Sequence, residues 1–181
     1  MPDIITHTNR ITLRLPENKD APEMIKLFNQ QDFIDNIRDK DIKTIAAAEH
    51  EVQVMHKHQR EHGFSLYMMD TDSETAIGVC GLVKRPELDI PDIGFAIRTE
   101  FQNQGFVTEA GKAVLKHSFE QLNLKTIAAI AKPDNLPSIA VINKMGFDFI
   151  DGIQLNDHEP QLKYFELQGQ QYKERYGVSN D

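Results

Sequence analysis

The sequence predicts an α/β (α+β) protein of a single domain, in which a mixed, mostly antiparallel sheet of about seven strands is flanked by about four helices. First, segments with the two-residue period of strands alternate along the chain with segments that have the helical period. Second, the 181 residues fit one domain, and the 40% that are hydrophobic can bury a sizeable core. We expect this domain to span 1–181, with its core over about 8–167 and a loosely held polar tail over 168–181.

The first third of the chain predicts one strand and two helices. Residues 10–15 alternate polar and apolar side chains, which is typical of a strand with one buried face. A helix follows, with Asp20 as its cap and Glu23 three residues later, as in a capping box. Residues 44–62 predict a second helix because their apolar positions are three and four apart, and Gly63 ends it.

The middle of the chain predicts three strands and a long helix. Residues 64–69 and 76–83 flank a polar turn, which favours an antiparallel hairpin, and 92–98 form the next strand. After Phe101 the period becomes helical, with a broad apolar face that continues to Asn123.

The last third predicts a buried strand, a short helix and a closing hairpin. The strand covers 126–131, and the helix runs from Pro137 to a left-handed cap at Gly146. Residues 147–155 and 161–167 form the hairpin.

Charge and composition narrow the class of protein. Lys and Arg total 20 and Asp and Glu total 28, a formal net charge of −8 that disfavours nucleic acid as a partner. No apolar run approaches the roughly 18 residues of a membrane span, and the chain does not begin like a secreted protein, so we expect no membrane contact and a cytoplasmic location. The single cysteine, Cys80, lies in an apolar run and reads as a buried strand thiol.

The turn at 101–110 joins a strand directly to a long helix through amide side chains and Gly105. A helix start presents unpaired N–H groups and a partial positive charge, and a glycine lets a ligand approach the backbone. This turn therefore predicts a pyrophosphate site. It lacks the Lys-Ser/Thr pair of a P-loop and the further glycines of a dinucleotide fingerprint.

The sequence resembles the GNAT superfamily of acyl-CoA-dependent N-acetyltransferases, and within it the RimJ/RimL-type branch of ribosomal-protein N-terminal acetyltransferases. The family signature Gln/Arg-x-x-Gly-x-Gly/Ala reads here from Gln102 to Val107, and Val107 departs from it. The resemblance covers about 8–167, and the blocks that carry it stand in the family's order: 10–14, 90–97, 101–110, 133–138 and 143–147.

The resemblance implies a sheet that splays between its fourth and fifth strands and holds acetyl-CoA in the opening. The fourth strand would pair with the pantetheine arm, and the turn would bind the pyrophosphate, with Arg98, Lys112 or Lys144 as cations for the outer phosphate. No metal is implied. The cofactor residues that the resemblance implies are Phe95, Ala96, Ile97, Arg98, Gln102, Asn103, Gln104, Gly105, Phe106, Val107, Asn135, Ser138 and Lys144.

Acetyl transfer needs a base for the amine, a polarised carbonyl and a proton for the departing thiolate. Glu100, between the fourth strand and the turn, is the first candidate base, and Asp92 is its rival. An N–H near Ile97 would polarise the carbonyl. Ile142 stands where many GNAT enzymes have a tyrosine acid, so we expect Ser138 to replace it.

Two other functions compete with this prediction. His58, Glu61 and His62 match the inverted motif of zinc proteases, which would make the chain a zinc-dependent hydrolase. The missing tyrosine also allows a non-catalytic sensor that binds acyl-CoA without turning it over.

The resemblance implies that the acceptor is a primary amine, on either a protein N-terminus or a small molecule. Acidic residues after the first helix could attract a cationic amine, and the terminal strands could supply the edge of a homodimer. These acidic residues are Asp32, Asp35, Asp39 and Asp41.

Overall fold

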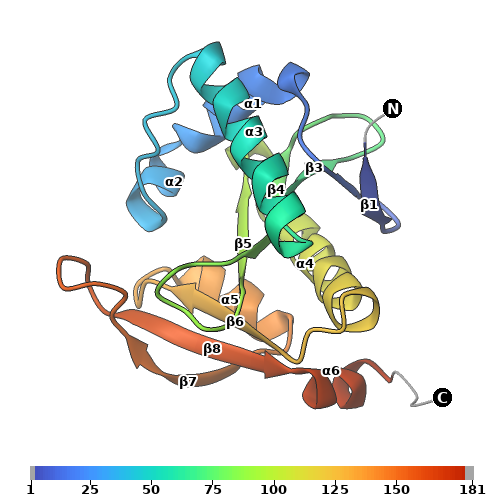
Figure 1. Cartoon of the computed structure of the whole chain (residues 1–181), viewed down its shortest axis with the longest axis vertical. Coiled ribbons are helices and arrows are strands. Elements are labelled where there is room, and N and C mark those ends of the chain that lie inside the picture. The colour runs from blue at the N-terminus through green and yellow to red at the C-terminus, as the bar shows by residue number, and fades with distance from the viewer. Residues whose placement is uncertain (1–2, 178–181) are drawn as a thin grey trace.

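The computed structural model describes residues 3–177 and contains one eight-stranded sheet in the order β1-β2-β3-β4-β5-β6-β8-β7 (Figure 1). Every neighbouring pair is antiparallel except β5 and β6. The sheet is therefore mixed and mostly antiparallel, as predicted. Its strands are β1 (Ile4–His7), β2 (Thr12–Arg14), β3 (Leu66–Asp70), β4 (Gly78–Val83), β5 (Asp92–Ile97), β6 (Thr126–Ala131), β7 (Asp148–Ile153) and β8 (Leu162–Gln168).

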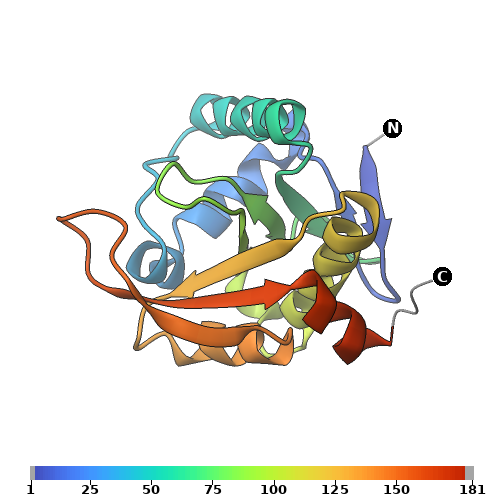
Figure 2. The same ribbon diagram turned by 60° about the horizontal axis from the view of Figure 1, so that its bottom comes forward.

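Six α-helices cover the two faces of the sheet, and Figure 2 shows α3 on one side and α5 on the other. They are α1 (Ala21–Phe28), α2 (Gln31–Asn36), α3 (Ile45–His62), α4 (Phe106–Lys116), α5 (Leu136–Lys144) and α6 (Gly169–Tyr176). Short helical turns are η1 (Asn18–Asp20), η2 (Thr99–Phe101) and η3 (His117–Gln121), the last with π geometry directly after α4. None of the described helices is long and apolar enough to cross a membrane.

Each face of the sheet has its own core. The larger core joins the sheet to α4, α5 and α6, and the smaller one joins it to α1, α2 and α3. Alternation along β5 sends Phe95 and Ile97 to the larger core and Ala96 to the smaller one. Cys80 is fully buried, as expected, and burial raises the pKa of its thiol to about 12.

The long local elements form where the sequence predicts them. Helix α3 begins after Thr44, whose hydroxyl accepts from the N–H of Ala47, and it ends at Gly63, which has a φ of 78°. The two predicted hairpins appear as the antiparallel pairs β3–β4 and β7–β8.

The predicted counts of seven strands and four helices are each too low. Strand β1 pairs with β2, but it is short and its pattern does not alternate cleanly. Helix α2 is also short, and only Phe33 is buried in it, so its apolar period is too weak to read.

The prediction of a loosely held tail was wrong for 169–176. These residues form α6, in which Tyr172 is 3% exposed and stacks on Phe119 at 4.8 Å between ring centroids. The last four residues of that tail, 178–181, lie outside the described residues.

Asp20 stands at the predicted start of α1, but its side chain caps nothing there. Its carboxylate instead accepts from both terminal nitrogens of Arg14, at 2.7 and 2.8 Å, and from the N–H of Glu17. Arg14 is 1% exposed and also donates to Asp70 at 2.5 Å. This buried cluster ties β2, η1 and β3 together.

Candidate active site

The candidate site begins where two parallel strands separate. Strand β6 pairs with β5 only at Asp92 and Ala128, where the N–H of Ala128 donates to the carbonyl of Pro91 at 2.9 Å. Beyond this pair the strands run in clearly different directions (Figure 1). The predicted splay is therefore present. The strands that the sequence numbers fourth and fifth are β5 and β6, because β1 was not predicted.

The edge of β5 that faces this opening carries the backbone groups of its odd-numbered residues. Arg98 donates its N–H to Ile77 of the strand segment on the other side, so Phe95 and Ile97 face the opening by alternation. Gln30, just before α2, donates to the carbonyl of Ile97 at 3.1 Å and accepts from the N–H of Thr99 at 2.8 Å. The groups left for a ligand are thus those of Phe95 and the N–H of Ile97.

The predicted phosphate turn lies at the mouth of the opening. Gly105 has a φ of 81° and precedes the first residue of α4, and no side chain caps the helix there. The first N–H groups of a helix have no partner within it. Several N–H groups therefore converge at Gly105 with no Cβ in front of them, which is the arrangement that a pyrophosphate requires.

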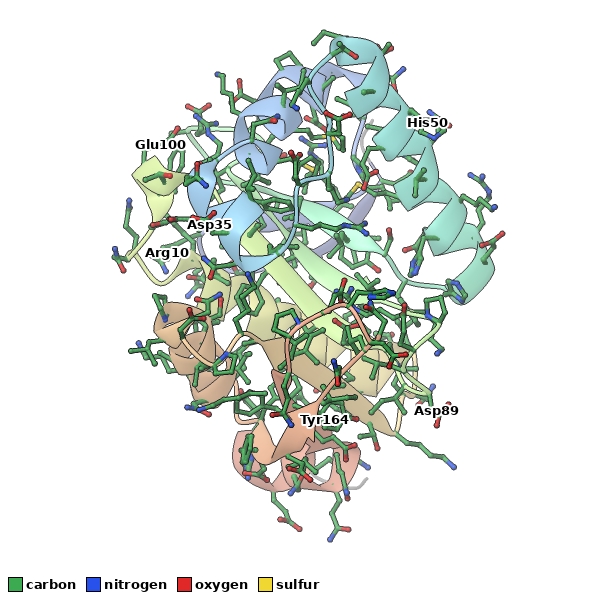
Figure 3. The ribbon with its side chains drawn as sticks, turned by 90° about the vertical axis from the view of Figure 1, so that its left-hand side faces the viewer. Arg10, Asp35, His50, Asp89, Glu100 and Tyr164 are labelled. Carbon is green, nitrogen blue, oxygen red and sulfur yellow. The ribbon has the colours of Figure 1, made fainter. Side chains whose placement is uncertain are left out.

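A cation that the sequence did not reveal lies behind this turn. Arg10 donates to the carbonyl of Gln104, 94 residues later, at 3.1 Å, and forms an ion pair with Glu109 at 2.6 Å. Its guanidinium also lies 4.6 Å from the ring centroid of Phe106. Figure 3 shows Arg10 and Glu100 at the same edge of the molecule, beside the segment that leads into α4. No local pattern connects residues so far apart in the chain.

The three cations predicted for the outer phosphate, Arg98, Lys112 and Lys144, have surroundings unlike those of Arg10. The side chain of Arg98 is 10% exposed and lies among the carboxylates of Glu23, Glu74 and Glu100, at 2.9, 3.6 and 2.6 Å. Carboxylates of this chain therefore surround its guanidinium group. Lys112 lies 5.7 Å from the ring centroid of Tyr176, and Lys144 is exposed in the last turn of α5.

The two candidate bases have opposite environments. The Glu100 side chain is 55% exposed, and hydrogen bonds from its own backbone N–H and from Arg98 lower its pKa. Asp92 is 1% exposed and accepts from Nε of Arg85 at 2.8 Å. Burial raises the pKa of Asp92, although Arg85 opposes the rise. A base with a pKa closer to neutrality accepts a proton more effectively, which favours Asp92.

Asn135 caps the start of α5, and Ser138 presents a hydroxyl group there. The side chain of Asn135 caps the helix by accepting from the N–H of Ser138 at 3.3 Å. The hydroxyl of Ser138 makes no hydrogen bond within residues 3–177, so it can serve a ligand. Ile142, where the family's tyrosine would stand, is 1% exposed in the larger core.

Helix α2 lies over the mouth of the opening. Asp32 accepts from the amide of Gln102 at 3.4 Å, and the carbonyl of Asp35 accepts from the ammonium of Lys132 at the end of β6. Figure 3 shows Asp35 in front of β5. Asp32 and Asp35 therefore lie near the site, whereas Asp41 is exposed and paired with Lys43.

The zinc-hydrolase alternative requires His58 as a metal ligand, but both of its ring nitrogens already have partners. The Nδ1 atom of His58 contacts the carbonyl of Phe64 at 2.9 Å, and Nε2 accepts from the N–H of Lys84 at 3.1 Å. Both ring nitrogens are thus engaged by the backbone. Within residues 3–177, no group of three or more His, Cys, Asp or Glu side chains is arranged to hold a metal ion.

The acetyltransferase (GNAT) domain family matches residues 10–148 of this sequence. The chain belongs to the GNAT acetyltransferase family. The resemblance on which the sequence predictions rest is confirmed, and this GNAT domain is an N-acetyltransferase.

Curated and solved relatives agree with this assignment. This GNAT domain is 28% identical over 151 residues to the uncharacterized N-acetyltransferase p20 of Bacillus licheniformis, covering 78% of this chain and 80% of p20. The RimL ribosomal L7/L12 alpha-N-protein acetyltransferase, solved with coenzyme A, superposes with a TM-score of 0.78 at 17% identity, covering 92% of this chain and 98% of RimL. The microcin C7 self-immunity acetyltransferase MccE, solved with acetyl-CoA and AMP, gives 0.76 at 20% identity, with 89% and 93% covered. These solved structures share the fold.

Proposed function

We propose that this GNAT domain transfers the acetyl group of acetyl-CoA to a primary amine by direct attack in a ternary complex. The observation that carries the proposal is the opening between β5 and β6, with an uncapped helix start at its mouth. Coenzyme A and acetyl-CoA in the solved RimL and MccE structures support acetyl-CoA as the cosubstrate.

The free edge of β5 suits the pantetheine arm of acetyl-CoA. Its amide groups would pair with Phe95 and with the N–H of Ile97, as an added strand would, so this N–H serves the arm in the proposal and not the thioester carbonyl, as the sequence had suggested. The pyrophosphate would accept from the N–H groups that begin at Gly105. This placement runs the arm inward from the turn, so the thioester would lie toward the closed end of the opening, where Asp92 is found.

We assign Asp92 as the base and keep Glu100 as the second candidate. The ammonium form of the acceptor must lose a proton before its nitrogen can attack the thioester carbon. As the carbon–nitrogen bond forms and the carbon–sulfur bond breaks, the departing thiolate takes up a proton and leaves as the CoA thiol. The unengaged hydroxyl of Ser138 is suited to donate a hydrogen bond to that sulfur.

A protein N-terminus is the acceptor to test first, because RimL, which shares this fold, is described as an alpha-N-protein acetyltransferase. The acidic side chains of α2 near the mouth, Asp32 and Asp35, would favour a cationic amine. Small-molecule amines belong in the same panel.

The deciding experiment is a calorimetric titration of acetyl-CoA into the protein and into Gly105→Asp, followed by measurement of CoA release with the amine panel. We expect micromolar binding, its loss in Gly105→Asp, and release with at least one acceptor. Tight binding without release for any amine would support the acyl-CoA sensor. A folded protein that binds no acetyl-CoA would overturn the proposal.

A further inference from the structure

Arg10 connects the loop between β1 and β2 to three parts of the phosphate turn. It donates to the carbonyl of Gln104 at 3.1 Å, lies over the ring of Phe106, and grips Glu109 through Nε at 2.7 Å and Nη2 at 2.6 Å. Thr8, from the same loop, donates its hydroxyl to Glu109 at 2.6 Å. The turn therefore does not hold its shape through local contacts alone.

The bond to Gln104 fixes the direction of the next N–H group. The carbonyl of Gln104 and the N–H of Gly105 belong to one trans peptide plane and point in opposite directions. Because Arg10 holds the carbonyl, the N–H of Gly105 must point away from Arg10. A Cβ on Gly105 would lie 3.4 Å from Nη2 of Arg10, so the turn and the guanidinium are closely packed.

The pair with Glu109 controls charge at the same place. Glu109 lies in the first turn of α4, where its negative charge would repel a bound pyrophosphate. Burial opposes its ionisation, but the hydrogen bonds from Thr8 and Arg10 prevail and lower its pKa. The carboxylate is thus ionised at neutral pH, and Arg10 compensates its charge.

We propose that Arg10 is a positioning residue for the cofactor pyrophosphate. It directs the N–H of Gly105 toward the ligand by holding the carbonyl of Gln104, and it neutralises Glu109 beside the phosphates. This inference rests on the proposed acetyl-CoA site. A tether that served stability alone would leave the affinity for the cofactor unchanged.

The test compares two acetyl donors in Arg10→Ala. The Michaelis constant for acetyl-CoA should rise about tenfold, the effect of losing one hydrogen bond near a charged group, with kcat unchanged. The constant for S-acetylpantetheine, which has no pyrophosphate, should stay within twofold of the original protein. A purely structural defect would affect both donors alike.

Three further variants separate the effect of the Arg10 charge from that of its hydrogen bond to Gln104 and its pair with Glu109. Arg10→Lys keeps the charge but not the fork, so it should recover part of the affinity for CoA. Glu109→Gln leaves the bond to Gln104 in place and removes the charge that repels the phosphates, so CoA should bind at least as tightly as before. Arg60→Ala, at an exposed arginine of α3, is the matched control.

Thermal unfolding of each variant shows whether it is folded at the assay temperature, and Arg10→Lys carries the comparison if Arg10→Ala is not. Folded position-10 variants that bind CoA within twofold of the original protein would overturn the inference and leave the proposed function intact. If the unaltered protein binds no CoA, the proposed function fails, and the inference fails with it.

Discussion

Asp92 and Glu100 belong to one stretch of the chain, yet the fold gives their carboxyl groups opposite tendencies. Glu100 is exposed and bonded to Arg98, which favours its charged form. Asp92 is buried at the closed end of the β5–β6 opening, which disfavours its charged form. The identity of a residue and its place in a motif do not determine burial, so the ranking of the two bases depends on the folded structure.

Asp92→Asn should lower kcat by about 10²- to 10⁴-fold, the usual contribution of a general base, with little change in the affinity for acetyl-CoA. Glu100→Gln should change kcat only a few-fold. Steady-state kinetics with calorimetry checks both. The assignment of Asp92 is wrong if Glu100→Gln has the larger effect while both variants stay folded.

The same assignment predicts the dependence on pH. A carboxyl group accepts a proton only when it is ionised, so kcat/KM should fall as the pH drops through the raised pKa of Asp92. This acid limb should lie above the usual range of aspartate and should disappear in the residual activity of Asp92→Asn. Its persistence would point to another group.

Ser138→Ala should lower kcat about tenfold or more, because a hydrogen bond to a charged group contributes roughly 1.5–3 kcal/mol. Acetyl-CoA should bind as before, because the side chain of Asn135 still accepts from the backbone N–H of residue 138 and caps α5. Rapid-quench measurement of the acetyl-transfer step would separate this effect from product release. Asn135→Ala, which should lower stability, is the contrasting variant.

Single elements are held in place by contacts between distant parts of the chain. The Arg14 cluster joins β2 to η1 and β3, and Tyr172 joins α6 to the segment that follows α4. A short element with few local signals can be stable when such contacts bury it. This explains why α6 is present although its local pattern did not predict it.

Replacing Arg14 by methionine should destabilise the protein by about 3–5 kcal/mol, because Asp20 and Asp70 would keep their charges without a buried partner. Urea unfolding followed by circular dichroism measures the change. Lys19→Met, which removes an exposed pair with Glu17, should cost less than about 1 kcal/mol. Equal effects of the two changes would show that burial does not strengthen the cluster.

Tyr172→Ala should cost about 3–5 kcal/mol, since it removes a buried ring that stacks on Phe119 and Tyr176. The variant should also be cut faster by proteases within α6. Gln170→Ala, which removes a pair with Glu174 on the exposed side, serves as the control. A loss of less than about 1 kcal/mol would mean that α6 contributes little to the folded state.

At the scale of the whole molecule, the opening divides the sheet into β1–β5 and β6–β8, with one residue pair between the two sets. Helix α2 spans this division. Gln30, just before the helix, bonds to Ile97 of β5, and Lys132, just after β6, bonds to Asp35 of the helix. A ligand that fills the opening would replace missing strand contacts and connect both sets. The site is therefore a product of the overall topology.

CoA at a hundredfold excess over its Kd should stabilise the protein by about 2.7 kcal/mol through mass action. Hydrogen exchange should slow at the N–H groups of Phe95 and Ile97 and at the start of α4, while α6 should change little. Protection spread evenly over the chain would argue against a ligand in the opening.

The sequence by itself determined the features that depend on neighbours along the chain. The period of α3 and its end at Gly63, the two hairpins, and the turn at Gly105 all follow from residue preferences within a few positions. The order of the motif blocks was also enough to indicate the GNAT family, which the family match confirms.

Only the tertiary structure decided which distant groups meet. It placed Arg10 behind the turn, gave Gln30 the carbonyl of Ile97, and buried Asp92 while leaving Glu100 exposed. It also brought Arg98 together with the carboxylates of Glu23 and Glu74, which lie far from it in the sequence. The physical reason is that burial and long-range hydrogen bonds depend on how elements pack, and local periodicity carries no information about that packing.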